Sequence, residues 1–196
     1  EVYRKYSFER YFDSFDHYYT IYQQRNTELW IEYGEGKITK DELNWQRFSY
    51  PLQAVGVEDE TLAEKFSEDF FAIIPPKSGL MPYAKEVLEY LAPKYNLYIL
   101  SNGFRELQSR KMRSAGVDIY FKKVILSEDL GVLKPWPEIF NFALSATQSE
   151  LRESLMIGDS WEADITGAHG IGMHQAFYNV TGRTSFPFQP TYHIYS

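Results

Sequence analysis

The chain has 196 residues, 44% hydrophobic and 24% charged, an ordinary globular composition with enough length for one good core or for a core and a smaller domain. A formal net charge of −7, with no lysine- or arginine-rich block and no apolar run near the roughly 20 residues of a membrane span, argues against a nucleic-acid polymer or a membrane as the main partner. The sequence has no cysteine, which excludes disulfides, thiolate zinc sites and cysteine nucleophiles.

Apolar and aromatic residues recur at helical spacing through residues 1–75. One long helix is predicted from a stripe formed by Phe12, Phe15, Tyr19, Tyr22 and Leu29. The segment "TKDE" (39–42) matches a capping box ahead of a second helix, and "VEDETLAEKFSEDFFAII" repeats the helical pattern. We expect a helical bundle packed with aromatic rings, and the alternative is that one or two of these rings stack on a substrate base.

The segment "IIPPKSGLMP" marks a boundary, with three prolines and a glycine. Beyond it, short apolar runs alternate with helix-length stretches, which is typical of parallel βαβ units. Strands are predicted at 96–100, 123–127, 155–157 and 175–179, and helices at 104–115, 137–146 and about 162–169. We therefore predict an α/β protein with a helical domain at 1–75 and a doubly wound, Rossmann-like core at 76–196. In such sheets, sites form beyond the carboxyl ends of the strands.

Polar residues follow the first two of these strands. After "NLYIL" come Ser101, Asn102 and Gly103, which either cap a helix or hold an oxyanion with the hydroxyl and the following amides. After "KVILS" comes the segment "EDLGVLKPWPEIF", which contains Lys134. This residue is either a solvated lysine or a point donor that neutralises phosphate charge.

Two acids follow the strand "LMI". Asp159 and Ser160 are both candidate helix caps, and Asp164 suits a first helical turn. A carboxylate at a strand end is also how Mg²⁺ is held, and a second acid can orient the lysine or a metal-bound water. A hydroxyl, a lysine and an acid pair on consecutive strand ends form a set of groups suited to phosphoryl transfer.

The ordered segments "LYILSNG", "GVLKPWPEIF" and "LMIGDSWEADITGA" resemble motifs two, three and four of the haloacid dehalogenase-like hydrolase superfamily, over residues 79–180. The resemblance implies a Rossmann-like core with an inserted four-helix cap and a Mg²⁺-dependent phosphatase. It implies that Ser101 binds the phosphoryl group, that Lys134 stabilises its charge, that Asp159 binds Mg²⁺ and that Asp164 supports the lysine and the metal shell. "SNGFRELQSRKMRSAGV" resembles the bacterial nucleoside 5′-monophosphatases, including pyrimidine nucleotidases.

The sequence departs from the superfamily in its first motif, an apolar strand ending in Asp-x-Asp that carries the nucleophile and the general acid/base. Asp13, Asp16 and Asp69 do not supply it, because each lies in a helical pattern with the wrong spacing. We expect the chain to be truncated at both ends, with the first motif upstream, and the core to lack a central strand. On this interpretation the 196 residues alone form no aspartyl-phosphate.

Two alternatives remain open. One is a 2-haloacid dehalogenase, whose chemistry needs no metal and has little use for Asp159, although Trp161 is an unusual neighbour in that turn. The other is a non-catalytic module of the same fold. We expect a cytoplasmic monomer or homodimer that acts on a small phosphate ester.

Overall fold

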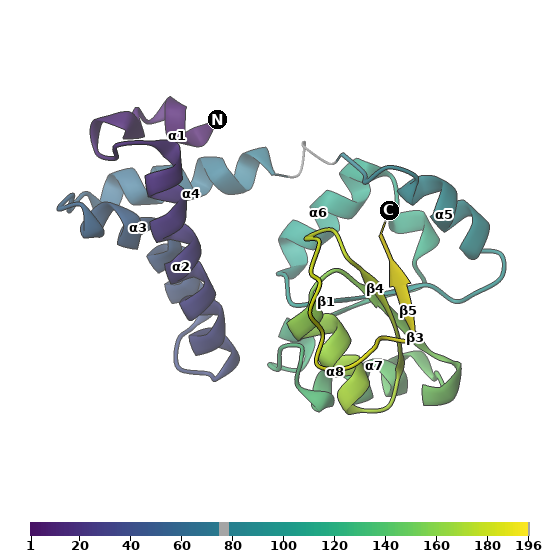
Figure 1. Cartoon of the computed structure of the whole chain (residues 1–196). Coiled ribbons are helices and arrows are strands. Elements are labelled where there is room, and N and C mark those ends of the chain that lie inside the picture. Colours follow the sequence, from purple (N-terminus) through teal and green to yellow (C-terminus); the bar gives the residue numbers. More distant parts are fainter. Residues whose placement is uncertain (75–78, 196) are drawn as a thin grey trace. The chain divides into compact units, whose positions relative to one another are not determined.

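The computed structural model describes residues 1–74 and 79–195, so residues 75–78 of the predicted boundary segment lie outside the described residues. The chain divides into two compact units, one of residues 1–79 with 110–115 and the other of residues 80–109 with 116–196. The first unit is helical and the second holds the parallel strands (Figure 1). The fold is therefore α/β, with a Rossmann-like core and a helical cap. Within the described residues, none of the helices combines the length and apolarity that crossing a bilayer requires.

Residues 1–74 of the first unit form four α-helices. Their bounds are α1 (Val2–Lys5), α2 (Phe15–Gly34), α3 (Lys40–Ala54) and α4 (Glu60–Ile73). Each of the three long helices begins at a side-chain cap, which satisfies one of its free amides: Ser14 for α2, Thr39 for α3 and Asp59 for α4. The predicted capping box is present, because Glu42 also accepts the Thr39 amide at 2.7 Å.

Aromatic rings fill the core of the first unit, as predicted. Its largest cluster of buried apolar residues consists of Val2, Tyr3, Phe8, Phe12, Tyr18, Phe48, Leu52, Ala63 and Phe66. Part of the predicted stripe is nevertheless wrong, since Phe15 is 51% exposed and Tyr19 is 45% exposed. The buried face of α2 instead passes through Tyr18 and Leu29. One residue advances a helix by about 100°, so a ring one position away from the stripe reaches the core in place of its neighbour.

The second unit alternates helices and strands. Its elements are α5 (Ala84–Leu91), β1 (Tyr98–Ser101), the first part of α6 (Arg105–Ala115, of which residues 110–115 are grouped with the first unit), β2 (Lys123–Leu126), α7 (Pro137–Thr147), β3 (Leu155–Gly158), α8 (Thr166–Gly170), β4 (His174–Tyr178) and β5 (Tyr192–Ile194). The strands and the helices after β1 and β2 confirm the predicted alternation within one or two residues. The helix after β3 is shorter than predicted, because a π-helical turn at Trp161–Ile165 precedes α8.

The strands form two separate parallel sheets, one of β1 and β2 and the other in the order β3, β4, β5. In the described parts of the chain, β1 and β3 therefore each have one edge without a partner strand. Leu155 and Ile157 lie on the same face of β3 and are 44% and 52% exposed, so the described residues leave that face largely uncovered.

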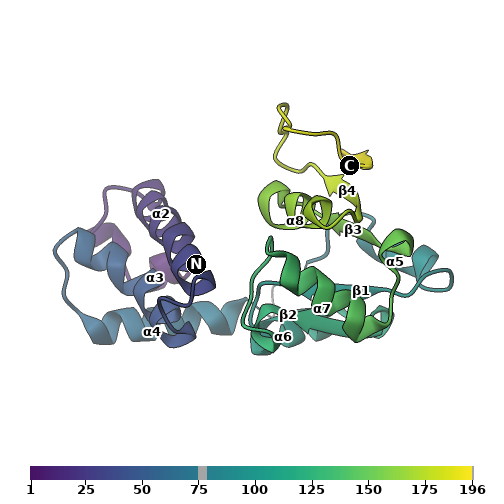
Figure 2. The same cartoon turned by 90° about the horizontal axis from the view of Figure 1, so that it is seen from below.

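Helices α7 and α8 connect the two sheets through a shared core, and Figure 2 shows both helices beside the strands. Ile139 and Phe140 of α7 are fully buried against Ala168 of α8. Leu100 of β1 and Met156 of β3 pack against this cluster. Strands β1 and β3 are therefore held in one core by apolar packing, although no ladder of hydrogen bonds pairs these two described strands.

Candidate active site

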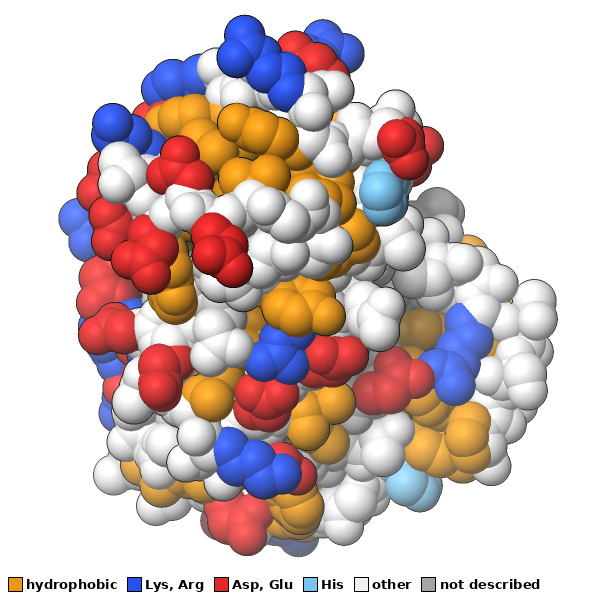
Figure 3. Space-filling view, turned by 90° about the vertical axis from the view of Figure 1, so that its left-hand side faces the viewer, with side chains coloured by type: hydrophobic (Ala, Val, Ile, Leu, Met, Phe, Trp, Pro, Cys, Tyr) orange, Lys and Arg blue, Asp and Glu red, His pale blue; other side chains and the backbone are white. Residues whose placement is uncertain are grey.

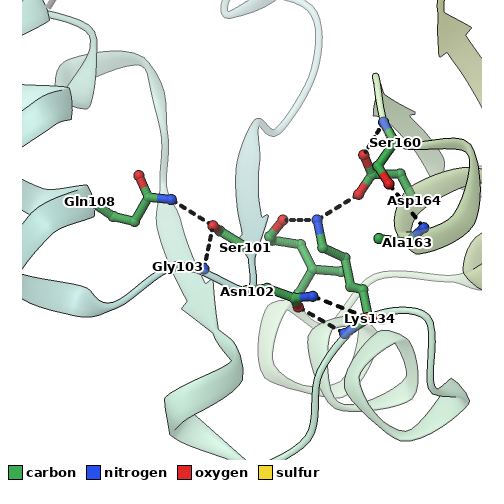
Figure 4. A network of polar contacts seen from close by, with 9 residues as sticks. Ser101, Asn102, Gly103, Gln108, Lys134, Ser160, Ala163 and Asp164 are labelled. Atoms are coloured by element: carbon green, nitrogen blue, oxygen red, sulfur yellow. Dashed lines mark hydrogen bonds and ion pairs between the residues drawn. The ribbon is translucent and has the colours of Figure 1, made fainter. Parts of the chain in front are cut away.

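The hydroxyl of Ser101 lies at the end of β1 and accepts two hydrogen bonds. The amide of Gly103 donates to its Oγ at 3.0 Å, and Nε2 of Gln108, from the first turn of α6, donates at 2.7 Å (Figure 4). The tight turn predicted after β1 is thus present. The Gly103 amide, one of the expected anion donors, is already paired with Ser101.

The side chain of Asn102 holds the main chain of Lys134 in place. Its Oδ1 accepts the Lys134 amide at 2.8 Å, and its Nδ2 donates to the Lys134 carbonyl at 3.0 Å (Figure 4). This two-point contact fixes the loop after β2 against the end of β1. Asn102 therefore positions the lysine, a role that the sequence alone did not indicate.

Lys134 is a buried lysine and not a solvated one, since its side chain is only 10% exposed. Its ammonium donates to the Leu100 carbonyl at 2.8 Å and to Oδ1 of Asp164 at 2.6 Å. An ammonium has three N–H donors, and these two contacts leave one of them without an acceptor among residues 1–74 and 79–195. The ammonium of Lys134 therefore bonds to β1 and to the turn after β3, and one of its N–H donors remains unpaired in the described chain.

The π-helical turn after β3 brings Asp164 back toward the strand end. The hydroxyl of Ser160 caps the turn by accepting the Ala163 amide at 3.1 Å. Oδ2 of Asp164 accepts the Ser160 amide at 3.1 Å, while Oδ1 accepts from Lys134. Single π turns are frequent at functional sites because they re-aim one side chain. Both oxygens of this buried carboxylate are engaged, so Asp164 orients the lysine.

Asp159 directly follows β3 and differs from Asp164 in its exposure to solvent and in its lack of a bonding partner in the described chain. Ser160 performs the capping for which Asp159 was the other candidate. The Asp159 side chain is exposed, and it makes no hydrogen bond or ion pair to the rest of the described chain. Of the two acids that follow β3, Asp159 is the one whose carboxylate is unpaired in the described chain.

The donor set can be tested for its fit to a divalent cation. Mg²⁺ binds through one or two carboxylates together with waters and substrate phosphate. Asp159 supplies one free carboxylate, which fits such an open site. A site built wholly from protein ligands does not fit, because the described residues contain no group of three or more acidic or histidine side chains that could hold a metal ion.

Trp161, the unusual neighbour of these acids, belongs to the core. Its ring is 4% exposed and packs edge-on against Phe177, with Phe186 and Phe188 at 4.9 Å between ring centroids. The guanidinium of Arg183 lies 5.1 Å from its ring centroid. Trp161 therefore anchors the turn that carries Asp164 and needs no role in chemistry.

Charges of both signs are interspersed over the face of the molecule that Figure 3 shows, without a continuous basic patch on that face. This agrees with the acidic net charge. The positive charge relevant to a small anion is local, at Lys134.

Comparison with known proteins shows the family. Residues 4–172 match the haloacid dehalogenase-like hydrolase family. The chain is 34% identical over 176 residues to the HAD-hydrolase YfnB of Bacillus subtilis, covering 88% of this chain and 74% of YfnB. It is 32% identical over 163 residues to the pyrimidine 5′-nucleotidase YjjG of Escherichia coli, covering 83% and 71%.

Solved structures agree in fold. The magnesium-bound crystal structure of B. subtilis YfnB superposes with a TM-score of 0.84 at 28% identity, covering 98% of this chain and 84% of that one. A 2-haloacid dehalogenase from Pseudomonas syringae superposes with a TM-score of 0.63 at 24% identity, covering 92% and 76%, and shares the fold alone. The chain described here belongs to the haloacid dehalogenase-like hydrolases.

Proposed function

We propose that this protein is a Mg²⁺-dependent phosphatase that hydrolyses small phosphomonoesters, with nucleoside 5′-monophosphates as its substrates. The observation that carries the proposal is the buried pair of Lys134 and Asp164, joined at 2.6 Å at the carboxyl ends of the strands beside Ser101. A buried ammonium with one N–H donor still unpaired in the described chain, held by the Leu100 carbonyl directly before Ser101, suits the charge that develops on a phosphoryl group.

Each group has a distinct part in this reaction. The Ser101 hydroxyl would donate a hydrogen bond to a non-bridging phosphoryl oxygen, and Lys134 would place its remaining N–H on another. Asp164 would keep the ammonium in position through Oδ1, and Asn102 would fix the lysine backbone. Because these donors are already oriented by the protein, little reorganisation is needed as charge develops.

Asp159 would hold the metal ion. Bound Mg²⁺ supplies charge neutralisation and a fixed orientation for the phosphate ester. The exposed carboxylate at the end of β3 is free for that task within the described chain, whereas Asp164 is committed to Lys134 and to the Ser160 amide.

The nucleophile in this proposal is an aspartate of the superfamily's first motif, on a strand that enters between β1 and β3. That carboxylate would attack phosphorus and form an aspartyl-phosphate as the ester oxygen leaves. A second aspartate of the same motif would protonate the leaving alkoxide and then take a proton from the attacking water. The 196 residues alone should therefore release no phosphate, and Mg²⁺-dependent turnover by them would refute this assignment.

The substrate class is supported by similarity. YjjG is named a pyrimidine 5′-nucleotidase, and so is PynA of Streptococcus pneumoniae, which is 31% identical over 188 residues. Phosphate release from a panel of nucleoside monophosphates and sugar phosphates, with and without EDTA, tests the proposal on the protein that carries its first motif. Chloride release from a 2-haloacid that survives EDTA would favour a dehalogenase instead.

The metal role has its own test. We expect Asp159→Asn to lower the rate at least about a hundredfold. Glu162→Gln is a matched control, because Glu162 lies in the same turn but is paired with Arg183 at 2.6 Å. Activity of Asp159→Asn within threefold of the parent would contradict metal binding by Asp159.

A further inference from the structure

A glutamine on α6 contacts the hydroxyl of the proposed phosphate site. Nε2 of Gln108 lies 2.7 Å from Oγ of Ser101, and the two residues are seven positions apart (Figure 4). Both residues are partly buried. Nothing in the sequence alone assigns a function to Gln108.

The hydrogen bonds at Ser101 leave its hydroxyl a single role. A serine oxygen has two acceptor lone pairs and one O–H donor. The Gly103 amide and the Gln108 amide together fill both lone pairs. The hydroxyl proton has no acceptor within the described part of the chain, so it is available for an incoming group and can only be donated.

The packing around Gly103 permits this contact. A Cβ on Gly103 would lie 2.4 Å from Nε2 of Gln108 and 3.0 Å from its Cδ. The glutamine amide therefore occupies the space that any larger residue at position 103 would need. A glycine after Asn102 allows the glutamine to reach Ser101, and an alanine would push the flexible end of that side chain away.

We infer that Gln108 is a positioning residue that holds the Ser101 hydroxyl as a hydrogen-bond donor. The site therefore selects ligands that present an unprotonated acceptor oxygen, as a phosphoryl dianion does. This inference rests on the proposed function for the identity of the ligand, but the hydrogen bond and its effect on Ser101 can be measured without turnover.

The first measurement concerns the hydrogen bond itself. In the 196-residue chain, Ser101→Ala should shift the side-chain NH₂ resonances of Gln108 in ¹H–¹⁵N spectra and leave other glutamine side chains in place. Ser109→Ala, one position along the same helix, is the control and should shift them little. Gln108 resonances that do not respond to Ser101→Ala would overturn the inference.

The second measurement concerns the ligand. With inorganic phosphate as the probe in calorimetric titrations of the protein that carries its first motif, Gln108→Met should weaken binding about tenfold. In a Ser101→Ala background the same substitution should change binding less than about twofold, because no hydroxyl remains to be oriented. Gly103→Ala, which displaces the Gln108 amide, should likewise weaken phosphate binding in the parent and change it little in the Ser101→Ala background. Equal losses in both backgrounds would show a merely structural role and overturn the inference.

The two measurements separate this inference from the proposed function. If the unsubstituted protein binds no phosphate, the proposed phosphatase is refuted, and the assignment of Gln108 as the residue that orients Ser101 is then decided by the resonance shift. If phosphate binds and Gln108→Met weakens its binding equally with and without the Ser101 hydroxyl, the proposed phosphatase is retained and the positioning role of Gln108 is refuted.

Discussion

Gly158 and Asp164 occupy the same small space at the end of β3. A Cβ on Gly158 would lie 2.3 Å from Oδ2 of Asp164 and 2.4 Å from its Cγ, distances that non-bonded atoms do not adopt. The missing side chain at position 158 is therefore what allows the Asp164 carboxylate to fold back onto the Ser160 amide and to meet Lys134.

We predict that Gly158→Ala destabilises the protein by about 1–3 kcal/mol, because the added methyl group displaces a buried carboxylate from its partners. Phosphatase activity should fall with it, since Lys134 loses its anchor. Gly170→Ala is the control: a Cβ on Gly170 would meet no described atom within 4 Å, and its effect should stay within about 0.5 kcal/mol. Urea unfolding of both variants measures the difference, and equal effects would contradict the steric argument.

The Lys134–Asp164 pair should show strong coupling. Both side chains are buried, at 10% and 7% exposure, so replacing either one by alanine leaves an uncompensated charge and should cost about 3–5 kcal/mol. The double variant Lys134→Met, Asp164→Leu should recover most of that stability, because no buried charge remains. It should have no measurable phosphatase activity. Recovered activity in the double variant would remove Lys134 from the mechanism.

The strand-to-helix pattern of the core was predictable because it depends on local periodicity. Short apolar runs followed by polar turn residues located β1, β2, β3 and β4 within one or two positions. The strand ends also indicated Ser101, Lys134, Asp159 and Asp164 as a set, because residues at the carboxyl ends of parallel strands share one edge. The order of the strands along the chain and the polar residues that follow them were enough to group these four residues.

The remaining contacts depend on three-dimensional packing. Gln108 meets Ser101 only because α6 turns back beside Gly103, and Asn102 bonds a backbone 32 positions away. Neither contact has a signature in residue type or spacing. The π turn that aims Asp164 is likewise not predictable, since the sequence predicts a helix there without fixing its hydrogen-bond register. Glycine at position 158 is a usable signal, but a turn after the strand explains it equally well.

In the first unit, Phe8 is predicted to carry much of the core stability. It is 1% exposed, stacks on Phe66 at 4.5 Å between centroids and contacts further rings. Phe8→Ala should cost about 3–5 kcal/mol. Ile31→Ala, on the exposed part of α2 at 57% exposure, should stay within about 0.5 kcal/mol. Thermal unfolding of both variants checks this, and a Phe8→Ala cost no larger than that of Ile31→Ala would refute the ring-packed core.

The contact between Tyr6 and Asp69 should make stability depend on alkaline pH. The Tyr6 hydroxyl donates to Asp69 at 2.6 Å, and this bond, aided by partial burial, raises the pKa of Tyr6 from 10.0 to about 12. The unfolded chain therefore loses this proton first, so the contribution is complete below pH 10 and is lost as the pH rises toward about 12. Tyr6→Phe should be less stable than the parent at neutral pH, and the difference should shrink across that window. Tyr11→Phe, whose hydroxyl has no hydrogen-bond partner in the described chain, should show no such trend. Urea unfolding at a series of pH values measures both, and a constant difference for Tyr6→Phe would show that the bond to Asp69 does not hold the proton.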